Sequence, residues 1–297
     1  MKIKFLFPVT LLFLFVIASC SKSDTGTGTG TGTTTIAEKT MLNVAYGTDP
    51  LQKMDIYLPA NRNITATKVL IYIHGGAWIG GDKADLNGAG IDSIRKRLPD
   101  YAVFNVNYRL AALPSTNAFP AQELDVKAAV EFVFGNRSSY LVSDKFVMMG
   151  HSAGGHLALL HAYKYPAPIK IKAVVDFFGP TNMVTMYSDY ASNPPGQIGL
   201  AALMSGTPAS NPTLYAQSSP LTFATTSAAC PTIILQGGTD VIVNANTQSV
   251  ALKDKLTLAA VVNQYVYYPL LPHGPWDAAT NTDAMNKIQP FLAANVQ

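Results

Sequence analysis

The segment Gly150-His-Ser152-Ala-Gly154 places a serine between a short apolar run and a helical pattern. The run before it, Lys145-Phe-Val-Met-Met149, is typical of a buried strand, and Ala153 to Lys164 is typical of a helix with small residues in its first turn. Small residues let the strand and the helix approach closely, so the chain turns sharply and exposes the hydroxyl. The pattern predicts a reactive serine rather than a plain glycine-rich turn.

Short apolar runs and helical patterns alternate from Met41 to the end of the chain. The runs predict strands near residues 41–46, 53–58, 68–73, 101–107, 145–149, 171–176, 232–236 and 264–268, and the patterns predict helices near 83–98, 121–135, 153–164, 245–259 and 280–294. This alternation is typical of an α/β fold whose mostly parallel sheet carries helices on both faces. Only turns separate the first strands, so we expect them to pair antiparallel.

Residues 179–223 interrupt this alternation, because they are rich in Pro, Asn, Ser, Tyr and Met and have no clean period. So long a connection in a compact domain usually covers a site, which predicts a cap-like insertion. A surface excursion without function is the alternative.

The N-terminus has the pattern of a bacterial lipoprotein signal. Residues 1–19 hold two lysines, an apolar run and small residues, and Ile17-Ala-Ser-Cys20 resembles a lipobox whose cysteine becomes lipidated. An ordinary signal peptide with an incidental cysteine is the alternative. Residues 20–37 are rich in Gly and Thr and predict a flexible tether. We therefore expect a domain over 38–297, lipid-anchored in the bacterial cell envelope at the outer membrane, facing the periplasm or the surface.

The composition limits the partners and the means of stabilisation. The chain has 297 residues, of which 48% are hydrophobic, which is enough for one large core. Lipidation of Cys20 would leave Cys230 as the remaining thiol, so no disulfide framework is expected. The formal charge of +3 falls to +1 without the two lysines of the signal, and no basic run suits a phosphate backbone, so nucleic acid is not expected as a partner.

A serine nucleophile needs a base within hydrogen-bond reach. Among the five histidines, His273 lies in a turn-rich loop after the last predicted strand, where it can reach across the sheet. His151 precedes the serine and is expected to point away, and His156 and His161 lie on the following helix. The five-residue spacings of these three do not put metal ligands on one helix face, so no metal is expected.

The base in turn needs an orienting acid. Asp240 follows a buried strand that ends in glycines, so its carboxylate is expected at the same sheet edge as the serine. Asp176, at the end of the preceding strand, is the rival. Asp254 lies within a helical pattern and is expected in solvent.

Acyl transfer also needs donors for the oxygen that becomes negative, and each is typically worth ~3 kcal/mol. The apolar run Val69 to Ile73 is followed by His74-Gly-Gly-Ala-Trp78, so the amides of Gly75 and Gly76 are expected to form this oxyanion hole together with that of Ala153. His74 is expected to be structural, and Trp78 is expected beside the substrate pocket.

Four segments together resemble the carboxylesterase-like branch of the α/β-hydrolase superfamily, and more closely the bacterial BD-FAE esterases, neighbours of the hormone-sensitive-lipase-like group. They are His74-Gly-Gly-Ala-Trp78, Val106-Asn-Tyr-Arg-Leu110, Phe119-Pro-Ala-Gln122 with Asp125-Val-Lys-Ala-Ala129, and Gly150-His-Ser-Ala-Gly-Gly155. The resemblance runs from about residue 40 to the end. It implies an eight-stranded sheet, hydrolysis without a cofactor, and a triad of Ser152, Asp240 and His273, which follows the α/β-hydrolase chain order.

Two departures from lipase-like relatives favour the BD-FAE group. Ala77-Trp78 stands where such relatives often have HGGG, and His151 stands where hormone-sensitive-lipase-like members commonly have Asp. The residues after Asp240, Val-Ile-Val-Asn-Ala, also lack the proline that is frequent there in relatives.

These observations predict a serine carboxylesterase that forms an acyl-serine intermediate. The resemblance implies acetyl or feruloyl esters of plant polysaccharide as substrates. An amide hydrolase, such as an arylformamidase or a small peptidase, is one alternative, and a non-catalytic surface binding protein is another. The sequence leaves the oligomeric state open.

Overall fold

The computed structural model describes residues 35–86, 88–114 and 116–297. The predicted signal peptide, Cys20 and residues 21–34 of the predicted tether lie outside the described residues. Residues Thr35–Gln297 form one compact unit.

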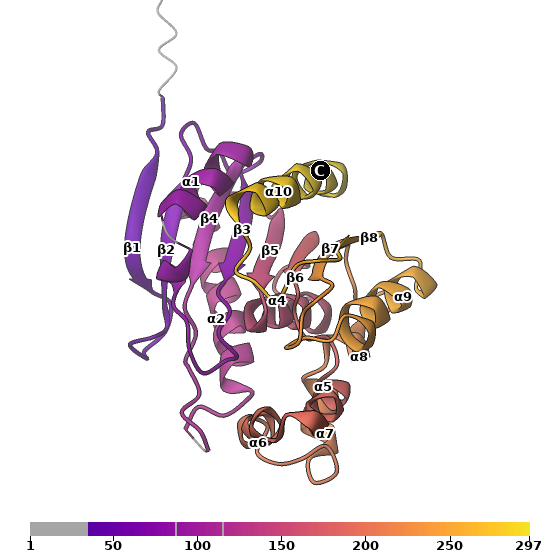
Figure 1. The fold of residues 1–297 in the computed structure, drawn as a ribbon. Coiled ribbons are helices and arrows are strands. Elements are labelled where there is room, and N and C mark those ends of the chain that lie inside the picture. Colours follow the sequence, from indigo (N-terminus) through magenta and orange to yellow (C-terminus); the bar gives the residue numbers. More distant parts are fainter. Residues whose placement is uncertain (1–34, 87, 115) are drawn as a thin grey trace, which may run out of the picture. The chain divides into compact units, whose positions relative to one another are not determined.

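The described residues form one eight-stranded sheet in the order β1-β2-β4-β3-β5-β6-β7-β8 (Figure 1). The strands are β1 (Lys39–Ala45), β2 (Lys53–Leu58), β3 (Lys68–Ile73), β4 (Tyr101–Val106), β5 (Phe146–His151), β6 (Ala173–Phe177), β7 (Thr232–Gly237) and β8 (Asn263–Tyr268). β4, β6 and β7 are buried along their whole length, as expected of apolar runs covered on both faces. The predicted α/β-hydrolase fold, with its mostly parallel sheet, is confirmed.

The antiparallel part of the sheet differs in one respect from the prediction. β1 pairs antiparallel with β2 as expected, but the second neighbour of β2 is β4 rather than β3. β3 instead lies between β4 and β5 and is parallel to both. The chain crosses over through a helix between β3 and β4, and this crossover makes them parallel neighbours, so β3 is central.

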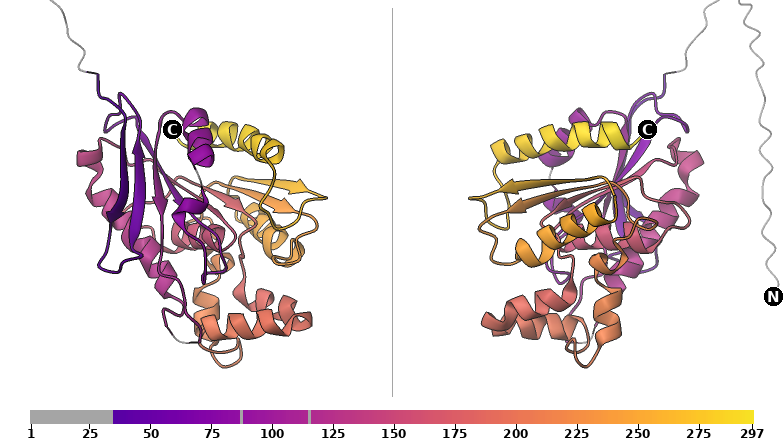
Figure 2. Two further views of the ribbon diagram at one scale, coloured as in Figure 1. Left: turned by 60° about the vertical axis from the view of Figure 1, so that its left-hand side comes forward. Right: turned by 90° about the vertical axis from the view of Figure 1, so that its right-hand side faces the viewer.

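Helices cover both faces of the sheet (Figure 2). They are α1 (Gly88–Arg97), α2 (Ala121–Gly135), α3 (Arg137–Tyr140), α4 (Ala153–Lys164), α5 (Met183–Asp189), α6 (Pro194–Leu203), α7 (Pro212–Gln217), α8 (Pro220–Phe223), α9 (Ala251–Leu258) and α10 (Ala278–Asn295), with the 3₁₀ turns η1 (Lys83–Asp85) and η2 (Tyr190–Ser192) and the π-helical turn η3 (Asn246–Val250). One core packs α2, α4 and α9 on one face, and the other packs α1 and α10 on the opposite face. Alternate residues of β3 point to opposite faces of the sheet. Val69 and Ile71 pack in the first core, and Leu70 and Tyr72 pack in the second.

Two predicted helices are interrupted. The pattern over 83–98 divides into η1 and α1, and the pattern over 245–259 divides into η3 and α9. At η1 the Asp82 carboxylate accepts from a backbone amide in a capping box, which closes a short turn before the longer helix.

The predicted insertion over 179–223 contains α5, η2, α6, α7 and α8. Each helix is too short to show a period, but the sequence holds a signal for three of them: Asn193-Pro194, Asn211-Pro212 and Ser219-Pro220 combine a cap residue with a proline at the helix start. These dipeptides indicate where α6, α7 and α8 begin, although the prediction for residues 179–223 contained no helix.

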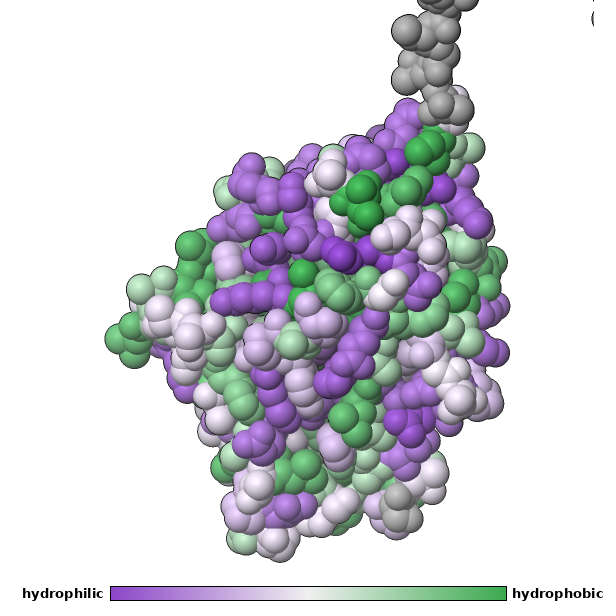
Figure 3. All heavy atoms as spheres, turned by 180° about the vertical axis from the view of Figure 1, so that it is seen from behind, coloured by the Kyte–Doolittle hydropathy of each residue, from purple (hydrophilic) through white to green (hydrophobic). Residues whose placement is uncertain are grey.

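Exposed apolar side chains are scattered among polar ones over the face drawn in Figure 3. Within residues 35–297, as far as they are described, no helix is long and apolar enough to span a membrane. Cys230 is a buried free thiol.

Candidate active site

Ser152 occupies the turn between β5 and α4 in a backbone conformation that non-glycine residues rarely adopt, with φ 53° and ψ −121°. Two glycines permit this turn. A Cβ on Gly150 would lie 2.3 Å from the carbonyl carbon of Gly154, and one on Gly154 would lie 2.1 Å from the carbonyl oxygen of Ile73. The sharp strand-to-helix turn that the sequence predicts is therefore present.

Ser152, His273 and Asp240 are joined by hydrogen bonds. His273 Nε2 lies 2.8 Å from Ser152 Oγ, and His273 Nδ1 lies 2.7 Å from Asp240 Oδ2. An ionised carboxylate only accepts, so Nδ1 carries the proton and Nε2 is free to accept from the serine hydroxyl. Ser152 follows β5, Asp240 follows β7, and His273 lies in the loop after β8. These three places meet at one edge of the sheet.

The Asp240 side chain is fully buried and surrounded by donors. Oδ1 accepts from the amides of Ile242 and Val243, each at 2.8 Å, and Oδ2 accepts from Gln236 Nε2 at 3.1 Å as well as from His273. Burial alone would raise the pKa of this carboxyl, but the hydrogen bonds from His273 and the backbone amides lower its pKa below the ordinary value. The group is thus held as a carboxylate.

The rival acids have different surroundings. Asp176, at the end of β6, is fully buried, and its Oδ1 accepts from the Gly179 amide at 3.0 Å. Its Oδ2 has no partner among the described residues, and burial raises its pKa to about 7. Asp254 on α9 is exposed and pairs with Lys253 at 2.5 Å. The structure joins neither of them to His273.

The remaining histidines near the turn pack within the fold. The ring of His151 stacks on Phe177 with centroids 4.1 Å apart, and its Nδ1 lies 3.0 Å from the Tyr72 hydroxyl. Burial, with a smaller contribution from the nearby His273, lowers the pKa of His151 to about 4. Burial also lowers the pKa of His161 on α4 to about 3. Both rings are therefore neutral at physiological pH.

The loop after β3 lies against the serine. A Cβ on Gly75 would lie 3.4 Å from Ser152 Cβ, so this backbone passes directly beside the hydroxyl-bearing residue. Gly76 has φ 109°, a conformation suited to glycine. In the described part of the chain, no acceptor is bonded to the amides of Gly75, Gly76 or Ala153. These three amides are free to donate to a bound group.

His74 and Tyr108 fix that loop. Their rings stack with centroids 4.3 Å apart, His74 Nδ1 bonds the Gly75 carbonyl at 2.7 Å, and the Tyr108 hydroxyl donates to the same carbonyl at 3.2 Å. Tyr108 follows β4. Its role could not be predicted from the sequence, because its contact with His74 joins the ends of two different strands and no nearby residue pattern indicates it.

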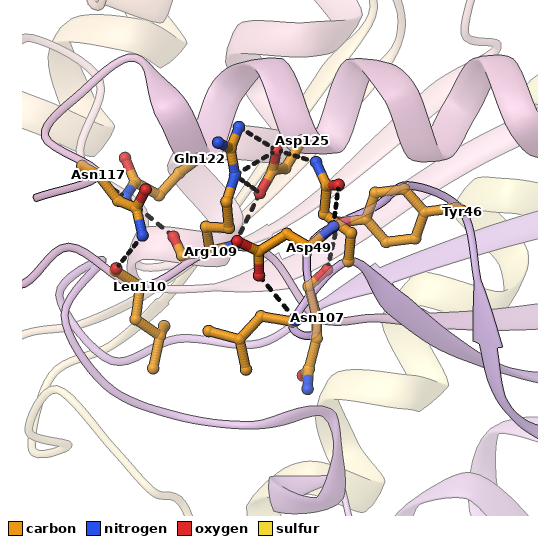
Figure 4. A network of polar contacts seen from close by, with 10 residues as sticks. Tyr46, Asp49, Asn107, Arg109, Leu110, Asn117, Gln122 and Asp125 are labelled. Atoms are coloured by element: carbon orange, nitrogen blue, oxygen red, sulfur yellow. Dashed lines mark hydrogen bonds and ion pairs between the residues drawn. The ribbon is translucent and has the colours of Figure 1, made fainter.

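A polar network holds the segment that carries Tyr108 on α2 (Figure 4). The Arg109 guanidinium pairs with the buried Asp125 carboxylate at 2.6 Å, and Gln122 Nε2 donates to the Arg109 carbonyl at 3.0 Å. The Ala111 amide then donates to the Trp78 carbonyl at 2.9 Å. The segments Val106–Leu110 and Asp125–Ala129 therefore support the loop beside Ser152.

A cavity of about 220 Å³ opens beside Ser152. Its lining consists of Ala77, Trp78, Ile79, Leu113, Ser152, Pro180, Met186, Tyr190, Pro195, Gly196, Gly199, Leu200, Leu203, Ile242 and Val243. The lining is almost wholly apolar, and eight of its residues come from the insertion. The insertion thus walls the space next to the serine.

Trp78 lines this cavity with its N–H turned to a buried partner. Its Nε1 donates to His156 Nδ1 at 3.2 Å, so His156 Nε2 carries the proton that bonds the Ser218 carbonyl at 2.7 Å. Burial lowers the pKa of His156 to about 4, which keeps this ring neutral. The described residues contain no group of three or more His, Cys, Asp or Glu side chains able to hold a metal ion.

Comparison with known proteins gives a family and a set of structural neighbours. A family model described as BD-FAE matches residues 54–256. A bifunctional GH43-CE of Bacteroides eggerthii has a TM-score of 0.72 and 27% identity, over 87% of this chain and 38% of that one. A truncated carbohydrate esterase from gut microbiota has a TM-score of 0.71 and 25% identity, over 87% of this chain and 96% of that one.

Curated relatives match over shorter stretches. Esterase LipC of Mycobacterium tuberculosis is 32% identical over 118 residues, 39% of this chain and 28% of LipC. Kynurenine formamidase of Salmo salar is 27% identical over 160 residues, 52% of this chain and 51% of the formamidase. The chain therefore spans about half or less of these relatives' own length.

Proposed function

The chain belongs to the BD-FAE family, and from this premise we propose that it is a serine hydrolase that cleaves carboxylic esters. The observation that carries the proposal is the chain of two hydrogen bonds from Ser152 through His273 to Asp240, at 2.8 and 2.7 Å. A hydroxyl in contact with a correctly oriented neutral imidazole is an activated nucleophile.

In the proposed reaction, Ser152 Oγ attacks the ester carbonyl carbon while His273 Nε2 takes the hydroxyl proton. The tetrahedral intermediate collapses, His273 returns this proton to the alcohol oxygen, and the acyl group stays on Ser152. Water then attacks the acyl-serine with His273 again as base, which releases the acid and restores the serine. Asp240 remains a carboxylate throughout and stabilises the imidazolium.

The proposed oxyanion hole consists of the amides of Gly75, Gly76 and Ala153. Supporting this role, none of them has an acceptor among the described residues, and Gly75 runs beside Ser152. Donors of this kind act on the oxygen that gains charge only in the transition state, so they raise kcat rather than substrate affinity.

We propose acetyl or feruloyl esters of plant polysaccharide as the natural substrates. The carbohydrate esterase among the structural neighbours, at 25% identity, and the bifunctional GH43-CE, at 27%, support this choice. The apolar cavity suits the acyl group, while a sugar would remain outside it.

Amide hydrolysis is the second candidate, because the kynurenine formamidase of Salmo salar matches about half of this chain. The same acyl-serine chemistry cleaves an N-formyl aryl amide when His273 protonates the leaving amine. Turnover of N-formylkynurenine at a higher kcat/KM than any ester would assign the protein to this class.

The cell location is also a proposal. Lipidation of Cys20 would anchor the domain to the bacterial envelope through the tether. Labelling of growing cells with a palmitate analogue tests it: the full chain should become labelled, and Cys20→Ser should not.

The first test of the function is turnover of p-nitrophenyl esters from acetate to octanoate by the full chain and by Ser152→Ala. We expect kcat to fall by roughly 10⁴-fold or more in the variant, since loss of a triad nucleophile costs at least that much. Unchanged melting would show that the variant is folded. Equal rates in both proteins would contradict serine catalysis.

A second panel tests the natural substrate. Acetylated and feruloylated xylan fragments should be deacylated by the wild-type protein. Turnover of p-nitrophenyl acetate without any rate on these fragments would refute the carbohydrate assignment and leave ester hydrolysis intact.

A further inference from the structure

Gln236 contacts the acid of the proposed triad from inside the sheet. It lies in β7, four residues before Asp240, and its side chain is fully buried. Its Nε2 donates to Asp240 Oδ2 at 3.1 Å and to the Gly237 carbonyl at 3.0 Å, with a longer contact of 3.4 Å to the Val243 carbonyl. Asp240 Oδ2 is the same oxygen that accepts from His273.

The surrounding groups determine which way the Gln236 amide points. All three neighbours of its nitrogen are acceptors, so the carbonyl oxygen cannot face them without losing every bond. That oxygen instead accepts from the Ser249 hydroxyl at 2.6 Å, and Ser249 is fully buried as well. Without this hydroxyl, nothing among the described side chains would hold the amide oxygen in place.

Ser249 is itself held by the π-helical turn η3, a type of turn that is frequent at functional sites. Its neighbour Gln248 accepts from the amides of Thr181 and Asn182 at 2.8 and 2.9 Å, at the start of the insertion. The turn η3 thus bonds the start of the insertion through Gln248 and the Gln236–Asp240 pair through Ser249.

We propose that Gln236, oriented by Ser249, is a positioning residue that sets the direction and basicity of Asp240 Oδ2 toward His273. The inference rests on the proposed function, because it assigns a role within the same triad. Since Gln236 shares Oδ2 with His273, it limits how strongly the carboxylate stabilises the imidazolium. Loss of its N–H should therefore misalign the acid and also favour the protonated form of His273.

The titratable groups around this pair do not obscure that effect. His151 on β5 has a pKa lowered to about 4 by burial, and Tyr190 in the insertion has a pKa raised to about 12 by burial. Asp176 on β6, whose pKa burial raises to about 7, is retained in every variant below and contributes equally to each profile.

The test compares wild type with Gln236→Met, which keeps the length without the amide, and with Ser249→Ala. We expect kcat for p-nitrophenyl butyrate to fall about 10- to 100-fold in Gln236→Met and about 3- to 10-fold in Ser249→Ala. KM should hold within about twofold, because neither residue lines the cavity. The acidic limb of the kcat/KM profile should move to higher pH in both variants. A merely destabilised protein would lose active fraction without moving this limb.

Two controls make the test specific. Ser143→Ala is the matched variant, because Ser143 is buried and lies before β5, at the end of that strand opposite to Ser152; it should keep wild-type kcat. Adding Ser249→Ala to Gln236→Met should lower kcat little further, since both changes remove the same hydrogen-bonded contact of Gln236 with Asp240. If Gln236→Met does not fold, the comparison of kcat between Ser249→Ala and Ser143→Ala decides. Ser249→Thr, which keeps the hydroxyl, should recover part of the rate.

The rate of Ser152 phosphonylation by a fluorophosphonate separates this inference from the ester assignment. Slower labelling in both variants would support the positioning role even if no ester were turned over, in which case only the proposed substrate class fails. Wild-type rates, or shifts of KM alone, in Gln236→Met and Ser249→Ala would overturn the inference while ester turnover by wild type stood. A wild-type protein that neither labels nor turns over esters would refute both.

Discussion

The connections that follow the neighbouring strands β6 and β7 contribute different parts of the site. After β6 the chain makes a long excursion whose residues supply more than half of the cavity lining. After β7 it makes a short glycine turn that delivers Asp240 to His273 at 2.7 Å. In the proposed mechanism, the first connection shapes the space for the substrate and the second orients the base.

The two strand ends also carry two buried carboxylates of opposite character. Asp240 has four donors and a pKa held below its ordinary value, whereas Asp176 has one donor, an unpartnered oxygen and a pKa raised by burial to about 7. Asp176 lies near the end of β6 and Asp240 lies in the loop after β7, at the same edge of the sheet, so position at this edge does not determine the environment of an acid. The number of donors around each carboxylate does.

The largest effect should come from removing the charge after β7. Asp240→Asn should lower kcat for p-nitrophenyl butyrate by about 10⁴-fold, because the amide no longer holds His273 in the tautomer that accepts from Ser152. Steady-state kinetics at pH 8 check this, with Asp254→Asn on exposed α9 as the matched control. A loss of less than tenfold would mean that another group orients His273.

A smaller and selective effect should come from the connection after β6. Gly199 on α6 lines the cavity, and a Cβ there would meet no atom within 4 Å, so Gly199→Leu should fit and fill the cavity. We expect kcat/KM for the octanoate ester to fall about 10- to 100-fold and that for acetate to change less than about twofold.

Gly135→Leu, at the exposed end of α2 where a Cβ would also meet nothing, controls for the added side chain. An equal loss on both esters in Gly199→Leu would contradict the assignment of this cavity to the acyl group.

The smallest effect on turnover should come from the acid at the end of β6. Asp176→Asn should change kcat by less than about threefold, because Asp176 is not bonded to His273 and an amide resembles its protonated form. A loss as large as that of Asp240→Asn would remove the distinction between the two strand ends.

The same variant should alter how stability depends on pH. The Asp176 carboxyl has a pKa near 3.8 in the unfolded chain, and burial raises this pKa to about 7 in the folded protein. Between these two pH values the unfolded chain releases a proton that the folded protein keeps. Wild type should therefore lose about 3 kcal/mol of unfolding free energy through this group as the pH rises from 4 to 7. Urea unfolding at pH 5 and pH 8 should show a smaller decline in Asp176→Asn.

Asp240 changes the dependence of stability on pH in the opposite direction to Asp176. Its lowered pKa means that the stability it contributes is present above the ordinary carboxyl pKa and is lost as the pH falls through the folded value. Asp240→Asn should therefore have a lower unfolding free energy than wild type at pH 7 and a smaller further decline as the pH falls through the acidic range. An equal or steeper decline in this variant would contradict the donor-rich environment described for Asp240.

The sequence predicted the strands well because their apolar runs must be buried on both faces of a parallel sheet. It placed Ser152, Asp240 and His273 at ends of strands or in loops that the sheet order brings together. It gave no role to Tyr108, Gln236 or Ser249, because each acts through a contact between elements distant in the sequence: Tyr108 with His74 and Ser249 with Gln236. The sequence analysis did not predict the helices of the insertion, because they are short and are stabilised by packing, with side-chain caps at α5 and α6, rather than by their own period.

The central claim is that Ser152 is the nucleophile activated through His273. Treating the full chain with a fluorophosphonate and mapping the adduct by peptide mass spectrometry tests it most directly, since the Oγ–phosphorus bond forms only as fluoride leaves. We expect a single adduct on the peptide that contains Ser152, absent in Ser152→Ala and slowed in Asp240→Asn. Labelling elsewhere, or none on the folded wild-type protein, would contradict it.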